Sequence, residues 1–103
     1  MSLKKKLIRK NFREAVFSRD NHCCVFCDCK ENLDPHHITD RHNFKNGGYV
    51  LENGITVCEI HHLECEQYHI SKGKSWVEGK HPDDLYKLIN SSYELAKEKD
   101  NER

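Results

Sequence analysis

The fold of this chain is decided by two short stretches, Asp34-Pro35-His36-His37-Ile38 and Asn53-Gly54-Ile55-Thr56-Val57-Cys58-Glu59-Ile60-His61-His62. Each stretch holds two adjacent histidines, and an asparagine opens the second one. A Cys24-x-x-Cys27 pair precedes the first stretch, and Cys58-x-x-His61 lies inside the second. Two sets of residues are therefore interleaved. One set suits a structural zinc ion, and the other suits a catalytic metal and the activation of water.

Length and composition indicate one small domain that is stabilised by a bound metal ion. The chain has 103 residues, of which 36% are hydrophobic and 33% are charged. Domains typically run to about 100–150 residues, so we expect a single domain, 1–103, with a modest core. Small domains with thin cores usually add a metal or disulfides. Six cysteines and eight histidines supply the material.

The cysteines favour metal binding over disulfides. No apolar signal-peptide core follows the basic start, Met1-Ser2-Leu3-Lys4-Lys5-Lys6, and no apolar run is long enough to cross a membrane. We therefore expect a protein of a reducing, cytoplasmic compartment with no membrane partner. Closely spaced cysteines in such a compartment bind metal more often than they pair.

The pattern of apolar residues predicts an α+β fold. A first helix is expected over residues 5–19, because Ile8, Phe12 and Val16 recur four residues apart among charged residues. The central unit, at about 19–70, is two short strands followed by a helix. The elements expected after the first helix are strands at 33–38 and 55–57, a flexible loop at 39–48, a helix from 58 to about 70, a last helix at about 82–98, and a frayed end from 97 to 103.

Four residues form the preferred zinc set: Cys24, Cys27, Cys58 and His61. Their two half-sites have the same two-residue spacing, and zinc accepts three thiolates and one imidazole. The alternative is that the cysteines are simply buried as small apolar residues. The register stays open among Cys23, Cys24, Cys27, Cys29, His61, His62 and Cys65.

His37, Asn53 and His62 are the candidate catalytic residues. A strand–strand–helix unit can bring them to one cleft, where a neutral imidazole can take a proton from water. Each also has a structural alternative. His36 and His37 point to opposite faces of a regular strand, although Pro35 could disturb it. Asn53 could serve only its Asn-Gly turn, and His62 could be an exposed helix residue.

Charge is unevenly distributed along a chain whose formal net charge is zero. The basic residues that precede the first acid, Glu14, are Lys4, Lys5, Lys6, Arg9, Lys10 and Arg13. Such a basic arm can follow a phosphate backbone, but it can equally be a solvated helix face.

In their order, these motifs resemble the HNH endonuclease family with its zinc-stapled ββα-metal (His-Me finger) core. The resemblance covers about residues 19–66 and rests on Arg19-Asp20, Cys24-Val25-Phe26-Cys27, Asp34-Pro35-His36-His37-Ile38, Gly47-Gly48 and the stretch from Glu52 to His62.

The resemblance implies roles for individual residues. His37 corresponds to the general base, and His36 to a ligand of the divalent cation. Asn53 corresponds to the middle asparagine, and His62 to the final motif residue, often a metal ligand. Many family members carry a histidine at the position of Glu66, which we keep as a candidate oxygen ligand.

The implied activity is cleavage of DNA by direct attack of water, which leaves a 5′-phosphate. The implied cofactors are a structural Zn²⁺ and a catalytic Mg²⁺, Mn²⁺ or Ni²⁺, although many zinc-bearing members have cysteine where this chain has His61. Small members of the family occur in phages and bacteria, so DNA-processing proteins of a bacterium or phage-infected cell are candidate partners. The candidate DNA contacts are Lys5, Arg9, Arg13, Arg41 and Lys45.

Two other function classes compete with the nuclease. One is a zinc-stapled DNA-binding module without activity, against which the intact His37, Asn53 and His62 argue. The other is a protein-interaction module on the same zinc fold, which would show an exposed apolar patch and no salt-sensitive affinity for DNA.

Overall fold

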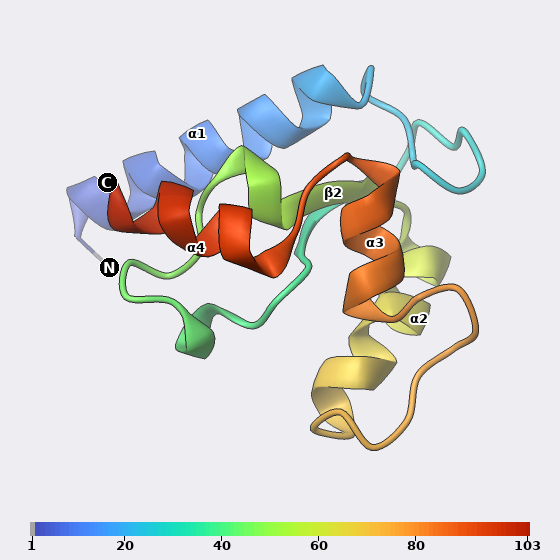
Figure 1. The fold of residues 1–103 in the computed structure, drawn as a ribbon. Coiled ribbons are helices and arrows are strands. Elements are labelled where there is room, and N and C mark those ends of the chain that lie inside the picture. Colours follow the sequence, from blue (N-terminus) through green and yellow to red (C-terminus); the bar gives the residue numbers. More distant parts are fainter. Residues whose placement is uncertain (1) are drawn as a thin grey trace.

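The computed structural model describes residues 2–103, which form four α-helices and one two-stranded antiparallel sheet (Figure 1). This is a small α+β fold, as the sequence predicts. In chain order its elements are α1 (Leu3–Arg19), β1 (Asp34–His37), the 3-10 turns η1 (Arg41–Asn43) and η2 (Leu51–Asn53), β2 (Gly54–Val57), α2 (Glu59–Ile70), α3 (Pro82–Leu88) and α4 (Tyr93–Asn101).

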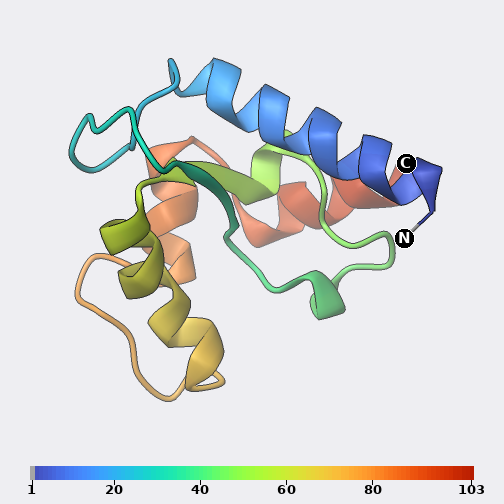
Figure 2. The same cartoon turned by 180° about the vertical axis from the view of Figure 1, so that it is seen from behind.

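Helix α1 packs its apolar stripe against the sheet. It begins two residues before the expected position, because the Ser2 side chain accepts a hydrogen bond from the Lys5 N–H and caps it. Phe12 and Val16 are its buried residues. They approach β2 so closely that a Cβ added to Gly54 would lie 2.6 Å from Val16 Cγ2. The absence of a side chain at Gly54 therefore lets α1 pack closely on the sheet. Figure 2 shows the helix lying along the sheet.

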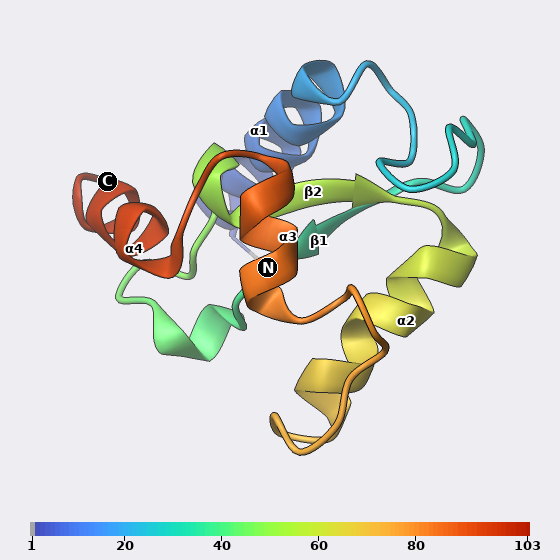
Figure 3. The ribbon, with the colours of Figure 1, turned by 45° about the vertical axis from the view of Figure 1, so that its right-hand side comes forward.

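The two strands pair with His36 opposite Ile55 and His37 opposite Gly54. Helix α2 follows β2 at once, with Cys58 as its N-cap residue. Figure 3 shows the sheet between α1 on one side and α2 on the other. Side chains alternate along a strand, so neighbouring residues of β1 face different helices.

The loop between the strands is fastened to the C-terminal helix. The buried Asp100 carboxylate of α4 accepts hydrogen bonds of 2.8 Å from the backbone N–H groups of Asn46 and Gly48. Gly48 has a φ of +68°, and a Cβ there would lie 2.6 Å from the Phe44 ring. The flexible loop expected at 39–48 is thus held at its C-terminal end by a carboxylate that comes from about 50 residues later in the chain.

The single last helix expected at about 82–98 is wrong. The structure has two helices, α3 and α4, separated by residues 89–92. Asn90 adopts a left-handed φ of +53°, which ends the first helix, and the Ser92 hydroxyl accepts from the Leu95 N–H and begins the second. The break lets α4 turn back onto the loop. The frayed end expected at 97–103 is also wrong, since α4 runs through the buried Asp100 to Asn101.

The core lies between the sheet, α2 and the two C-terminal helices. Its buried members are Ile38, Phe44, Val50, Ile55, Val57, Cys65, Leu85, Tyr86 and Ala96. Among residues 2–103, no helix is long and apolar enough to span a membrane.

Candidate functional site

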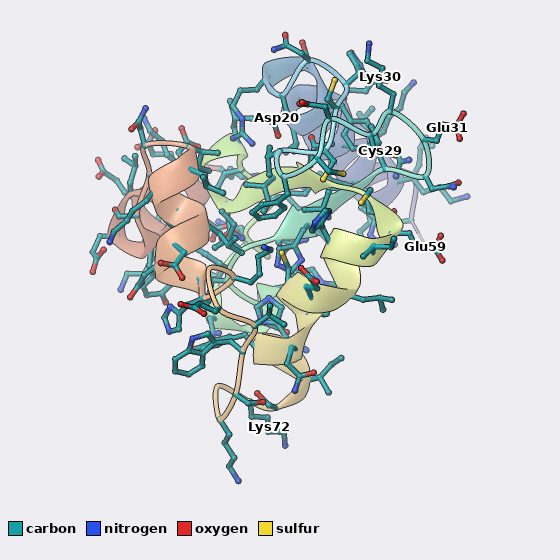
Figure 4. The ribbon with its side chains drawn as sticks, turned by 90° about the vertical axis from the view of Figure 1, so that its right-hand side faces the viewer. Asp20, Cys29, Lys30, Glu31, Glu59 and Lys72 are labelled. Atoms are coloured by element: carbon teal, nitrogen blue, oxygen red, sulfur yellow. The ribbon has the colours of Figure 1, made fainter. Side chains whose placement is uncertain are left out.

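One candidate metal centre joins the loop after α1 to the start of α2. Its four ligand atoms all lie within 4.8 Å of one another and belong to Cys24, Cys27, Cys58 and His61. In Figure 4 the sulfur atoms, drawn in yellow, gather where this loop, marked by Cys29, approaches the end of α2 marked by Glu59. This is the set preferred from the sequence, and the cluster could hold a structural zinc.

The distances fit a tetrahedral zinc ion. With zinc–sulfur bonds of about 2.3 Å and zinc–nitrogen bonds of about 2.0 Å, ligand atoms should lie about 3.5–3.8 Å apart. The Sγ atoms of Cys27 and Cys58 are 3.8 Å apart, and Cys24 Sγ lies 3.6 Å from His61 Nδ1. The Cys58–His61 pair is closer, at 3.2 Å. The spacing therefore needs only small adjustments to hold the ion.

Protonation of the cysteines also suits a metal. The backbone N–H of His61, together with its ring, lowers the pKa of Cys58 to about 6. The backbone N–H of Cys29 lowers the pKa of Cys27, but burial and the neighbouring Cys24 and Cys58 outweigh it and raise the pKa to about 11. The crowded thiols thus resist joint ionisation, and a divalent cation is what would stabilise three thiolates together.

The turn that carries Cys24 and Cys27 is built by the backbone. The Cys24 N–H donates to the Cys29 carbonyl, and the Asp28 N–H donates to the Cys24 carbonyl, at 2.8 and 3.1 Å. The Val25 N–H donates to the carbonyl of Thr56 in β2. These bonds hold the turn against the strand that leads directly to Cys58.

The three remaining cysteines lie outside this cluster. The thiols of Cys23 and Cys29 contact the backbone carbonyls of Asn21 and Glu31, at 3.2 and 3.5 Å. Cys65 is buried in the core, and burial raises its pKa to about 12. All six cysteines are free thiols.

A second cluster on α2 and β1 could also hold a metal ion, and it consists of His36, His62 and Glu66. His36 Nδ1 and His62 Nε2 each lie 3.2 Å from Glu66 Oε1. His36 is 1% exposed, and neither of its ring nitrogens has a hydrogen-bond partner of good geometry. A buried imidazole with two unsatisfied nitrogens needs a partner, and a cation is one that its chemistry fits.

The charges in this cluster suit a cation. The rings of His36 and His62 hold the pKa of Glu66 well below its usual range, so the carboxylate is ionised. Burial lowers the pKa of His36, which keeps its ring neutral and leaves a lone pair free. Glu66, and then Asp34, raise the pKa of His62, so a metal would compete with a proton there.

His37 points to the opposite side of β1 from His36. Its ring stacks on Phe12 of α1 with centroids 4.6 Å apart, and the Tyr49 ring meets it edge-on at 4.9 Å. Burial, and then the charge of Arg41, lower the pKa of His37 to about 4. The ring is therefore neutral near pH 7 and able to accept a proton.

A groove of about 540 Å³ is lined by His37, by two residues of the second cluster and by basic side chains. It is lined by Arg9, Lys10, Phe12, Arg13, Pro35, His37, Asp40, Arg41, Tyr49, His62, Glu66 and His69. Three of the five predicted DNA-contact residues, Arg9, Arg13 and Arg41, are in this set, whereas Lys5 and Lys45 are not. Lys5 lines an adjoining hollow, and Lys45 lines neither.

Asn53 is not among the residues that line the groove. Its side chain is fully buried, and its amide group bonds to the Thr39 backbone and to the Gly48 carbonyl. The Tyr86 hydroxyl also donates to its oxygen. Asn53 therefore ties together the two ends of the loop that carries Tyr49, which makes it a positioning residue in this geometry.

The sequence prediction gave no role to two residues that line the groove, His69 and Tyr49, or to Asp34, which neighbours His62. His69 lies seven residues after His62, hence two turns further along the same face of α2, and its Nε2 lies 3.0 Å from the His37 carbonyl. Asp34 Oδ2 lies 3.5 Å from His62 Nδ1. Helical spacing could have found His69. Tyr49, next to the two glycines, gave no local signal because Arg9, Phe12 and His37, which it contacts, are distant in sequence.

Comparisons with known protein families, with curated proteins and with solved structures found no match to this chain.

Proposed function

We propose that this protein is a metal-dependent endonuclease of the HNH class that hydrolyses phosphodiester bonds in DNA and leaves a 5′-phosphate. One observation carries the proposal. A neutral histidine, His37, lines the same groove as two members of a metal-type cluster, His62 and Glu66, and as three arginines. Phosphodiester hydrolysis needs a proton acceptor, a cation site and positive charge for the phosphates.

The order of elements supports the ββα-metal architecture at the centre of the proposal. Strands β1 and β2 pair, and α2 follows β2 without a loop. The strand–helix junction supplies half of the zinc cluster through Cys58 and His61. The same helix carries His62 and Glu66 one turn apart, so a zinc ion would brace the element that presents the second cluster.

His37 acts as the general base in this proposal. Its neutral ring can take a proton from the attacking water, and packing on Phe12 and Tyr49 holds the ring in place. His36, His62 and Glu66 would hold the catalytic cation, such as Mg²⁺, Mn²⁺ or Ni²⁺. That cation would polarise the phosphate and stabilise the leaving oxygen.

DNA is the proposed partner. Arg9, Arg13 and Arg41 line the groove and suit phosphate oxygens, with Lys5 close by in the adjoining hollow. Lys45 is an exposed residue outside both hollows and is the weakest of the five contacts.

The test is relaxation of supercoiled plasmid by zinc-loaded protein with Mg²⁺, Mn²⁺ or Ni²⁺. His37→Ala should lose activity while it stays folded with unchanged zinc content, and its melting temperature should fall only by the loss of the ring's packing on Phe12 and Tyr49. The matched control is His22→Asn, which replaces an exposed histidine outside the groove. His22 has a left-handed φ of +55°, and asparagine tolerates this conformation. Full activity in His37→Ala would refute its role as the base. No cleavage by folded wild type with any cation would favour a DNA-binding module without activity.

One observation favours a protein-interaction module as the second candidate. Three apolar side chains on one face of α2, Ile60, Leu63 and Ile70, are 69%, 68% and 70% exposed. DNA affinity that falls with salt would support the nuclease or the DNA-binding module. Salt-independent or absent affinity would support the interaction module.

A further inference from the structure

Two arginines from distant parts of the chain converge on one tyrosine hydroxyl. Arg9 Nε of α1 donates to Tyr49 Oη at 3.4 Å, and Arg41 Nη1 of η1 donates to the same oxygen at 2.9 Å. Within residues 2–103, neither guanidinium lies within 4.0 Å of a carboxylate. Two positive charges therefore meet on a neutral group without a direct ion pair, and the acid that acts on Arg41 by charge is Asp40, which also lines the groove.

These three residues stand at the junction of two hollows. All three line the groove that contains His37, and all three also line an adjoining hollow of about 620 Å³. The second hollow is completed by Lys5, Ile8, His42, Asn46 and Gly47. A chain of phosphates passing through the groove would thus meet the three residues next to the reacting position.

Tyr49 ties this junction to the proposed base. Its ring meets His37 edge-on at 4.9 Å and Phe12 edge-on at 5.7 Å, so the place of its hydroxyl relative to His37 is set by packing. Burial alone would raise the pKa of Tyr49, but the hydrogen bonds from Arg9 and Arg41 outweigh burial and lower it. The lowered pKa reflects a locally positive field, which is the field that an anion would find there.

We propose that Arg9, Arg41 and Tyr49 form a phosphate-binding subsite for a phosphodiester next to the one that is cleaved. The inference rests on the proposed nuclease function, because it takes the ligand to be the backbone of DNA. Guanidinium groups match phosphate oxygens in geometry and charge. The Tyr49 oxygen accepts from both arginines, which leaves its own hydrogen free to donate to a phosphate oxygen.

Arg13, the third arginine of the groove, lacks this arrangement. Arg13 Nη2 donates a hydrogen bond of 3.4 Å to the Leu33 carbonyl, and its guanidinium lies over the Phe17 ring, 4.7 Å from the ring centroid. The subsite should therefore give the enzyme a preference for substrates that carry a second phosphate beside the reacting one. A diester with a single phosphate would not use it.

The first test is DNA binding, measured by anisotropy of a labelled duplex with zinc-loaded protein and no added divalent cation. Arg9→Gln should weaken binding about threefold or more and lower the salt slope by about one. Tyr49→Phe keeps the ring packing and the charge, so it should weaken binding with little change of slope. Lys87→Gln is the charge-matched control, since Lys87 is exposed on α3 and lines neither hollow.

The second test compares two substrates in cleavage. Arg9→Gln and Tyr49→Phe should lose more kcat/KM on a DNA oligonucleotide than on bis(p-nitrophenyl) phosphate, with the difference mainly in KM. Equal losses on the two substrates would mean that the residues hold the reacting phosphate itself, which would overturn the inference.

The binding and cleavage measurements distinguish an incorrect subsite proposal from an incorrect nuclease proposal. Binding by Arg9→Gln and Tyr49→Phe that equals that of Lys87→Gln would overturn the subsite even if the wild type cleaves DNA. Weakened binding in these variants would support the subsite even if the wild type shows no cleavage. Melting temperature and zinc content of each variant confirm that it is folded.

Discussion

The hydroxyl of Tyr86 on α3 donates a 2.7 Å hydrogen bond to the side-chain oxygen of Asn53. Both residues are buried, and Thr39 Oγ1 lies 2.6 Å from the same hydroxyl. Because the Tyr86 hydrogen points to Asn53, the Thr39 hydroxyl is the donor of that shorter bond. A helix near the C-terminal end of the chain therefore holds Asn53 in place.

This arrangement predicts that Asn53 acts through stability and positioning. Asn53→Ala should lower the free energy of unfolding by about 2–4 kcal/mol, because it leaves buried donors and acceptors without partners. Tyr86→Phe removes one of these bonds and should cost about 1 kcal/mol. Urea denaturation of zinc-loaded protein measures both. An Asn53→Ala variant as stable as the wild type yet inactive would instead place Asn53 in direct contact with the substrate.

Asp100 is predicted to control the loop that carries Tyr49. Asp100→Asn replaces a buried acceptor of two backbone N–H groups with a neutral amide, which should cost about 1.5–3 kcal/mol. Glu98→Gln is the control, because Glu98 is exposed on the same helix. Hydrogen exchange of the Asn46 and Gly48 amides should speed up in Asp100→Asn alone. Unchanged exchange would show that the loop is held by its other contacts.

Metal removal should change which cysteines react. In zinc-loaded protein a thiol reagent should modify Cys23 and Cys29 first, because they lie outside the cluster and are partly exposed. Chelation should expose Cys58, whose pKa of about 6 makes it a thiolate near pH 7, while Cys65 stays protected by burial until the protein unfolds. Mass spectrometry of the modified peptides gives the order.

The ligand set itself has a separate check. Cys24→Ser should lose zinc and melt at a lower temperature, since a structural zinc contributes directly to folding. Cys29→Ser is the matched control outside the cluster and should keep both. If Cys24→Ser retains its zinc and its melting temperature, the register of ligands is wrong.

His37 should make the protein less stable in acid. Its pKa falls from 6.5 to about 4 on folding, so the unfolded chain binds more protons between these values. The stability from its neutral ring is therefore complete above pH 6.5 and is lost as the pH falls from 6.5 toward 4. Denaturation at pH 7 and pH 5 should show a smaller difference in His37→Asn than in the wild type. An equal difference would mean that His37 titrates normally.

How much of the site could be predicted depends on how local its causes are. Cys24 and Cys27 lie in one tight turn, and Cys58 and His61 lie at one strand–helix junction, so spacing alone was enough to select them. Helix α1 followed from its apolar stripe in the same way. The break between α3 and α4 was missed because the apolar pattern continues through it, while the left-handed Asn90 gives little signal by itself.

The residue types and their spacing along the chain specify the kinds of chemistry available: a Cys₃His set, adjacent histidines on a strand, and acidic and imidazole groups one turn apart on a helix. The surroundings of these groups depend on how the whole chain folds. The tertiary structure buried His36 toward α2 and turned His37 toward α1, enclosed Asn53, and brought Arg9 and Arg41 to Tyr49. Spacing along the chain controls only contacts within a turn or a helix. Burial, charge and the meeting of distant side chains arise only when the whole chain packs.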